Sequence, residues 1–113
     1  MTTRQLYKKE WRTYLDFLSI FLEGKNAEIE IASLSLGEQV VAEWLPFLGI
    51  SYDAKDDLIE VGLEGIDHLI GRPREVYIDD GAGELISIEI VDTEGARQIV
   101  KLRDPLMLPA PAR

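Results

Sequence analysis

The first quarter of the chain carries its apolar side chains at helical spacing. Apolar residues recur there every three or four positions, and most charged residues lie off this stripe. Thr2 or Thr3 can supply an N-cap, and Gly24 stands where a left-handed C-cap is commonly needed. The pattern predicts an amphipathic helix over residues 4–23 whose broad, aromatic-rich face packs on a large surface.

After Gly24 the period changes to the two-residue alternation of strands. Residues 27–31 alternate strictly between isoleucine or alanine and glutamate, which is typical of a half-buried strand. Residues 38–48 fit a strand with a bend at Pro46 or a short helix, because proline disfavours the interior of either element. Alternation and glycine-rich breaks predict the remaining strands at 57–64, 75–79, 85–91 and 98–102, with a short apolar piece at 66–70 and a turn at 80–83.

One helix followed by short strands predicts an α+β fold. We expect an N-terminal amphipathic helix packed on an antiparallel meander sheet of five to six strands. The pattern leaves open whether the sheet stays open or curls into a small barrel. Residues 1–103 are expected to form a single domain, and the proline-rich tail 104–113 is expected to be extended or disordered.

Charge narrows the range of partners. The net charge of −9 divides into +2 for residues 1–25, −14 for residues 26–96 and +3 for residues 97–113. Such an acidic middle repels phosphate backbones and anionic lipids, so a basic protein partner fits better than nucleic acid or a membrane. No apolar run approaches the roughly 20 residues that cross a bilayer, so a cytoplasmic location is expected. The absence of cysteine excludes disulfides and thiolate chemistry.

Two features are candidates for ligand chemistry. Asp53, Asp56 and Asp57 lie within five residues, but their spacing does not match a known calcium loop, and acidic surface turns are common. His68 is the only histidine and follows Asp67, so it could ligate a metal or act as a general acid–base group; a structural histidine beside a turn is more common. With no nucleophile motif or phosphate-binding loop, neither catalysis nor a cofactor is expected.

Four residues are candidates for partner contacts. Arg72 and Arg74 form a basic island in the acidic middle, and could bind an anionic group or pair with the chain's own acids. Trp11 and Phe17 belong to the aromatic set of the helix, and aromatic side chains at helical spacing usually form core but also anchor interfaces. Phe17 lies near the edge of the stripe, so we expect it to be exposed or in a dimer contact.

Three short motifs carry a resemblance. Trp11 with the YLD run at residues 14–16, GISYD at 49–53 and DHLI-x-RP at 67–73 together resemble a small bacterial family of single-domain proteins with no established activity. The resemblance covers about residues 5–103 and implies a bacterial source but no mechanism. The strand-rich second half is also similar to PRC-barrel domains, which are small β-barrels that often act as adaptors.

These features favour a non-enzymatic protein-interaction or adaptor module that forms a homodimer or binds a basic partner. The alternative is a small-ligand or divalent-cation binding domain that uses the acidic loop at residues 53–60. An enzyme that uses His68 has the least support.

Overall fold

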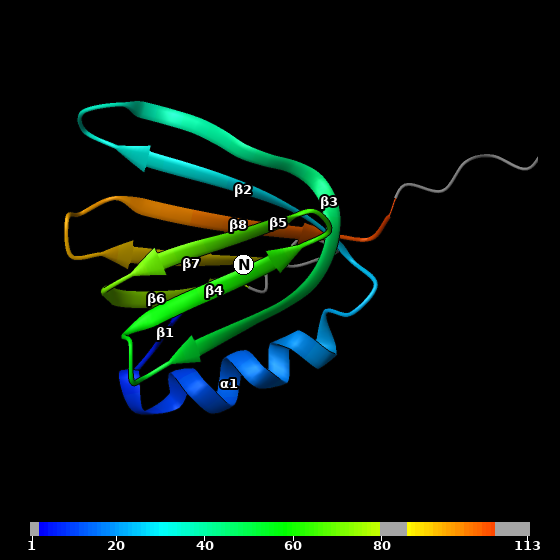
Figure 1. The fold of residues 1–113 in the computed structure, drawn as a ribbon, viewed down its shortest axis with the longest axis horizontal. Helices are drawn as coiled ribbons and strands as arrows, with labels where there is room; N and C mark the ends of the chain where they lie inside the picture. Colours follow the sequence, from blue (N-terminus) through cyan, green and yellow to red (C-terminus); the bar gives the residue numbers. More distant parts are fainter. Residues whose placement is uncertain (1–2, 80–85, 106–113) are drawn as a thin grey trace, which may run out of the picture.

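The computed structural model describes residues 3–79 and 86–105 and contains one helix and eight strands in that part of the chain. Figure 1 shows the helix beneath a strongly curled sheet. The elements in chain order are β1 (Thr3–Leu6), α1 (Lys8–Phe21), β2 (Asn26–Ser33), β3 (Gly37–Asp53), β4 (Leu58–Leu63), β5 (Ile66–Gly71), β6 (Pro73–Asp79), β7 (Ile86–Asp92) and β8 (Arg97–Arg103).

The N-terminal segment differs from the predicted helix over residues 4–23. Thr3–Leu6 is strand β1, which pairs antiparallel with β6, so the prediction of a helix from residue 4 and of a threonine cap is wrong. The helix is instead capped by Glu10, whose Oε1 accepts the Tyr7 amide at 3.1 Å. At the other end Gly24 takes the expected left-handed conformation, with φ +89°.

The eight strands form one antiparallel sheet in the order β1-β6-β7-β8-β2-β3-β4-β5. The α+β class and the antiparallel sheet are confirmed, but five to six strands were too few. The six predicted strands are all present, and β1 and β5 are the additional ones. The sheet consists of two meanders, β6-β7-β8 and β2-β3-β4-β5, joined where β8 pairs with β2, and β1 adds to the edge at β6. It is open, since β1 and β5 are the end strands of the order that the described residues form.

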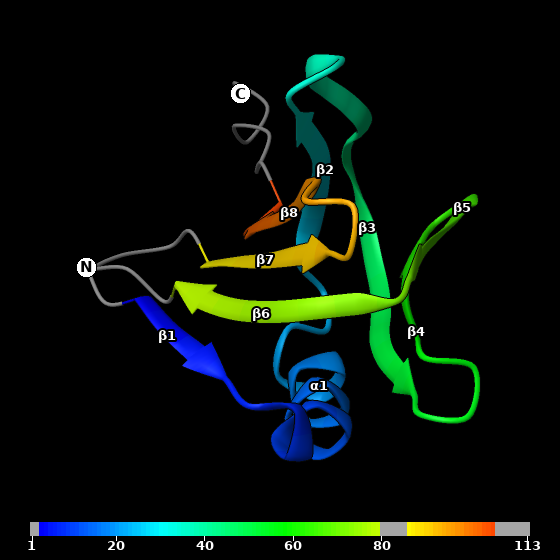
Figure 2. The same ribbon diagram turned by 90° about the vertical axis from the view of Figure 1, so that its left-hand side faces the viewer.

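Strand β3 carries the sheet from one layer to the other. Its first half, up to Pro46, pairs with β2, and its second half, from Phe47, pairs with β4. The expected bend near Pro46 is present: Trp44 has φ +48°, and its ring lies 3.7 Å from the guanidinium carbon of Arg103. Figure 2 shows the result, with β4 and β5 on one side and β6, β7 and β8 on the other.

The core lies between these two layers and α1. The alternation predicted for β4 is confirmed, because Ile59, Val61 and Leu63 are all buried. From the helix, Trp11 meets the ring of Tyr52 edge-on at 5.1 Å between centroids. Since α1 packs chiefly on β3, the helix closes one side of the space between the layers.

A serine hydroxyl joins the helix to the sheet. Ser19 Oγ accepts the Ile50 amide at 2.8 Å and donates to the Ile50 carbonyl oxygen at 2.6 Å. On the free edge of β3, the hydroxyl thereby satisfies the two backbone groups of Ile50 that a neighbouring strand would otherwise bond. The approach is close, since a Cβ added at Gly49 would lie 3.4 Å from Ser19 Oγ. This contact fixes which face of α1 points to solvent.

Candidate functional site

The solvent face of α1 is strongly apolar in its second half. Phe17 is 51% exposed, Ile20 is 75% exposed and Phe21 is 59% exposed. The Phe17 and Phe21 rings stack at 5.5 Å between centroids, and Tyr14 meets Phe17 edge-on at 5.8 Å. The ring ladder is therefore preformed, and large exposed apolar side chains grouped on one face are typical of protein contact surfaces.

Trp11 does not belong to this surface. It is only 1% exposed, and its Nε1 donates to the Leu6 carbonyl oxygen at 2.9 Å inside the core. The expectation that Trp11 contacts a partner is corrected accordingly. Tyr7 and Phe21 are exposed, because the helix begins after Tyr7 and presents Phe21 at its flank. The expected exposure of Phe17 is confirmed.

The acidic loop is a self-contained turn. Asp53 Oδ1 accepts the amides of Lys55 at 2.9 Å and Asp56 at 3.4 Å, which is the bonding of an Asx turn. Asp57 has φ +49°, and its carbonyl oxygen accepts the Arg72 amide at 2.8 Å. The turn between β3 and β4 is thus held by its own backbone and side chains.

The Asp57 carboxylate is bonded to the core rather than directed to solvent. Its Oδ1 accepts the Tyr52 hydroxyl at 2.8 Å. Burial, and then this hydrogen bond to a carboxylate, raises the pKa of Tyr52 from 10.0 to about 12. Tyr52 stays a neutral donor across the physiological range, and Asp57 has one oxygen fewer to offer a cation.

His68 lies away from these aspartates and takes part in a different network. Its Nε2 is 2.5 Å from Gln98 Oε1, and Gln98 Nε2 donates to Asp92 Oδ2 at 3.2 Å. Asp92 only accepts, so it fixes the orientation of the Gln98 amide, and His68 must donate from Nε2. Asp92 Oδ1 also accepts the amides of Glu94 and Ala96 at the β7–β8 turn.

These positions bear directly on the cation hypothesis. Among residues 3–79 and 86–105, no three histidine, aspartate or glutamate side chains are grouped so that they could hold a metal ion. The candidates Asp53, Asp56, Asp57 and His68 therefore do not form one ligand set. His68 pairs in register with Val61, whereas the acidic turn lies beside Gly71 at the other end of β5.

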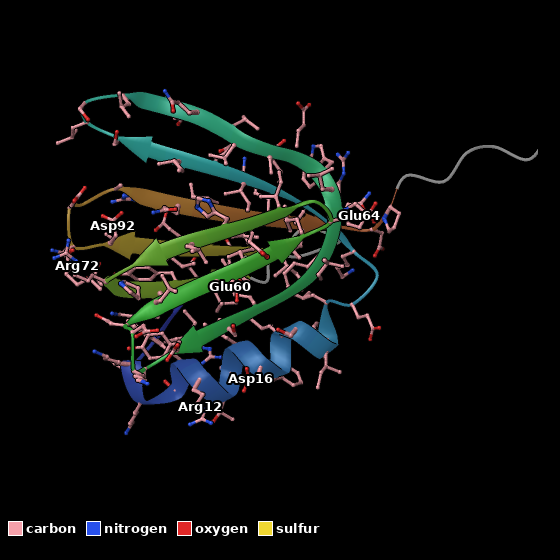
Figure 3. The ribbon with its side chains drawn as sticks, viewed as in Figure 1. Arg12, Asp16, Glu60, Glu64, Arg72 and Asp92 are labelled. Atoms are coloured by element: carbon pink, nitrogen blue, oxygen red, sulfur yellow. The ribbon has the colours of Figure 1, made fainter. Side chains whose placement is uncertain are left out.

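The basic island lies at one end of the molecule. Arg72 and Arg74 are both exposed, and neither forms an ion pair with another described residue. Arg72 has φ +49°, and its carbonyl oxygen accepts the Thr93 amide at 3.2 Å, so its backbone joins two turns. Figure 3 shows Arg72 and Asp92 at this end of the molecule. The side chains of Arg72 and Arg74 are available for a partner, which stays a prediction.

A shallow groove runs between α1 and the outer face of β3, β4 and β5. Its lining includes the carboxylates Asp16, Glu60 and Asp67 and, at its floor, the paired glycines Gly49 and Gly62. Figure 3 shows Asp16 on α1 and Glu60 on β4 above it. The groove is acidic and lined by no basic side chain.

Two glutamates on β2, Glu28 and Glu30, interact with each other through their side chains. Burial, and then a hydrogen bond that the protonated Glu28 carboxyl donates to the Glu30 carboxylate, raises the pKa of Glu28. Glu30 also pairs with Lys101 at 3.1 Å. The pair does not line any of the described grooves, so no substrate position is defined beside it.

Comparison with known proteins gives a family. The family described as "Family of unknown function (DUF5335)" matches residues 2–111. This chain belongs to that family. An uncharacterized protein of Aquifex aeolicus (strain VF5) is 39% identical over 110 residues, which are 96% of this chain and 99% of that relative.

Membership of the DUF5335 family confirms the resemblance to a small family of unknown function. No solved structure matches the chain. The described part of this DUF5335 chain contains no helix with the length and apolarity needed to cross a membrane.

Sequence reasoning missed two of the most informative residues in this DUF5335 member. Gln98 shares a strand face with the buried Val100 and Leu102, and a polar residue in an apolar register was a usable signal for a buried hydrogen bond. Ile20 lies on the helix face opposite the buried stripe, where an isoleucine is unexpected. Gln98 is a polar residue on an apolar face, and Ile20 is an apolar residue on a polar face.

Proposed function

We propose that this chain is a non-enzymatic protein-interaction module that docks a protein partner on the solvent face of α1. The observation that carries the proposal is the exposure of Phe17, Ile20 and Phe21 on one helix that is already anchored by its opposite face. Complete burial of a fully exposed side chain of this kind contributes roughly 1.5–3 kcal/mol. Docking would gain the part of this energy that corresponds to the 51–75% of each side chain that is still exposed. A docked partner is the simplest way to gain that energy.

The rest of the molecule supports a binding role over a catalytic one. The side chains of His68, Gln98 and Asp92 bond to one another and so join strands β5, β8 and β7. Tyr52 is held in its neutral form inside the core. The acidic groove and the net charge of −9 favour a basic or mixed-charge protein surface and disfavour nucleic acid and anionic membranes. The alternative, cation or small-ligand binding at residues 53–60, has only the acidity of that turn in its favour.

A second apolar surface lies at the β2–β3 hairpin tip. Leu34, Leu36, Val40 and Val41 are all exposed there, and the hairpin extends beyond the rest of the sheet. Nothing in its surroundings specifies an occupant, so the proposal rests on α1 alone.

Site-specific photocrosslinking in cells of the source organism tests the proposed function. Benzoylphenylalanine is placed at Phe17 or Ile20, and the matched control carries it at Thr93, which is exposed on the β7–β8 turn. We expect a discrete protein adduct from both α1 positions and none from Thr93. A chain that gives no adduct from α1, or the same adducts from Thr93, would not be an interaction module of this kind.

A further inference from the structure

The charges of α1 are separated along its length. Lys8, Lys9 and Arg12 lie in its first half together with one acid, the capping residue Glu10, and Asp16 and Glu23 lie in or just after its second half. Apart from Glu10, this order is the reverse of the one that the helix dipole favours, with anions at the N-terminus and cations at the C-terminus, and the last turn of α1 has no basic residue. The order therefore weakens the helix slightly, and intrahelical stability does not account for it.

These charges also form no ion pair with another residue of the part of the chain that the structure describes. The ion pairs among the described residues involve Lys25, Arg97 and Lys101, and none involves a charged residue of α1. Figure 3 shows Arg12 and Asp16 on the exposed side of the helix. A surface with a basic half and an acidic half is complementary to itself when one copy is reversed.

Spacing places three of these charges, Lys9, Asp16 and Glu23, on one helix face with Ile20. Lys9, Thr13, Asp16, Ile20 and Glu23 follow each other at intervals of four and three residues, and all are exposed. Phe17 lies beside the stripe, near its midpoint. The stripe thus has a cation at one end and an anion at the other, with Ile20 within it and Phe17 flanking its midpoint at Asp16.

The charge balance of the helix also favours contact between copies. Two chains of charge −9 repel each other over most of their surfaces. Residues 8–23 carry three basic and three acidic side chains, so α1 is a neutral surface on an acidic molecule. Contact through α1 brings two copies together where repulsion is least.

We propose that the partner of the α1 face is a second copy of this chain, bound as an antiparallel helix pair across a two-fold axis near Phe17. In this pair Thr13 packs against Ile20 of the second copy, and Lys9 lies beside Glu23 of the second copy, twice by symmetry. The Phe17 rings meet at the axis, and Arg12, one turn before Asp16, offsets the charge that two copies of Asp16 bring there. This inference rests on the proposed function and specifies its partner.

Charge reversal tests the pair, with association measured by light scattering and sedimentation of the purified chain over a concentration series. Lys9→Glu and Glu23→Lys each turn two attractive contacts into repulsive ones. We expect each to weaken the dimer about tenfold, and the double variant to return to within about threefold of wild type. Glu64→Lys, an equal charge change on the β4–β5 turn, is the matched control and should not weaken association.

Glu23→Lys separates this pairing from a general charge effect. It lowers the magnitude of the net charge, so repulsion alone would make the dimer tighter, whereas the pairing predicts a weaker one. A tighter dimer with Glu23→Lys, or a double variant that fails to recover, would overturn the antiparallel pair. If the chain is monomeric at every concentration but the α1 crosslinker gives an adduct with a different protein, self-pairing is wrong and the interaction module stands.

Discussion

Nε2 of His68 on β5 lies 2.5 Å from Oε1 of Gln98 on β8, and this contact joins the two layers of the curled sheet. The two strands are far apart in the strand order, since β8 is separated from β5 by β2, β3 and β4. Gln98 is 8% exposed and is the buried polar residue of a strand face that is otherwise apolar. A side-chain bond therefore joins edge strand β5 to interior strand β8 across the space between the two layers, while the edges β1 and β5 stay unpaired with each other.

Gln98→Met tests the contact between the layers, because methionine has a similar volume but cannot form the two hydrogen bonds of the Gln98 amide. Asp92 Oδ2 and His68 each lose a partner in a half-buried setting. We expect the free energy of unfolding to fall by about 1–3 kcal/mol in urea denaturation. The matched control is Gln39→Met on the exposed part of β3, which should stay within about 0.5 kcal/mol of wild type. Equal stability of the two variants would contradict the role given to Gln98.

Ser19→Ala should loosen α1 from the sheet. The variant leaves the amide and the carbonyl oxygen of Ile50 without the hydroxyl that bonds both. Each is part-buried, so we expect a loss of about 1–3 kcal/mol in the free energy of unfolding and faster hydrogen exchange at the Ile50 amide. Ser51→Ala, one residue along β3 and exposed, is the control. An unchanged rate of hydrogen exchange at the Ile50 amide in Ser19→Ala would show that the Ser19 hydroxyl does not protect the edge of β3.

Most strands could be predicted because their burial alternates with a two-residue period. This holds for β4, where three alternate residues are buried, and for β6, where the alternate residues Val76 and Ile78 are buried. β1 could not be predicted in this way, because a four-residue edge strand with one buried side chain, Leu6, depends on β6 for its pairing. The predicted helix therefore included most of the residues of β1.

The candidate surface was predictable only in part. Phe17 could be assigned to the edge of the helical stripe, and its exposure followed. Trp11 could not be separated from it by spacing alone, since its burial depends on Leu6 and Tyr52, which come from two other strands. The His68 contact depends on the bend of β3 that brings β5 over β8, and no local pattern specifies the direction of that bend.

Tyr52 should make stability depend on pH in the alkaline range. Its pKa is raised to about 12 in the folded protein, from 10.0, so the folded state holds the phenol proton more tightly. The contribution is intact below pH 10, and stability falls as the pH rises from 10 towards 12. We expect Tyr52→Phe to show a shallower loss of stability over this interval in urea titrations. A parallel pH dependence in the two proteins would mean that Tyr52 ionises normally.

Divalent cations should not stabilise the fold through the acidic turn. The Asp53 and Asp57 carboxylates are already bonded to amides and to the Tyr52 hydroxyl, which leaves Asp56 as the free carboxylate of the three aspartates. A ligand at 100 times its dissociation constant stabilises by about 2.7 kcal/mol, so a specific site would raise the melting temperature by several degrees. We expect no such rise in thermal melts with calcium, magnesium, manganese or zinc after EDTA treatment.

Asp56→Asn and Asp57→Asn provide the control for that experiment. A rise in melting temperature that persists in both variants would come from elsewhere on this acidic chain, and the turn would remain a structural element. A rise of several degrees that both variants abolish would mean that the turn rearranges to release the Asp53 and Asp57 oxygens. Cation binding at residues 53–60 would then replace the α1 contact as the best-supported function. Only a specific site would bind a cation tightly enough to offset the free energy lost with the broken hydrogen bonds.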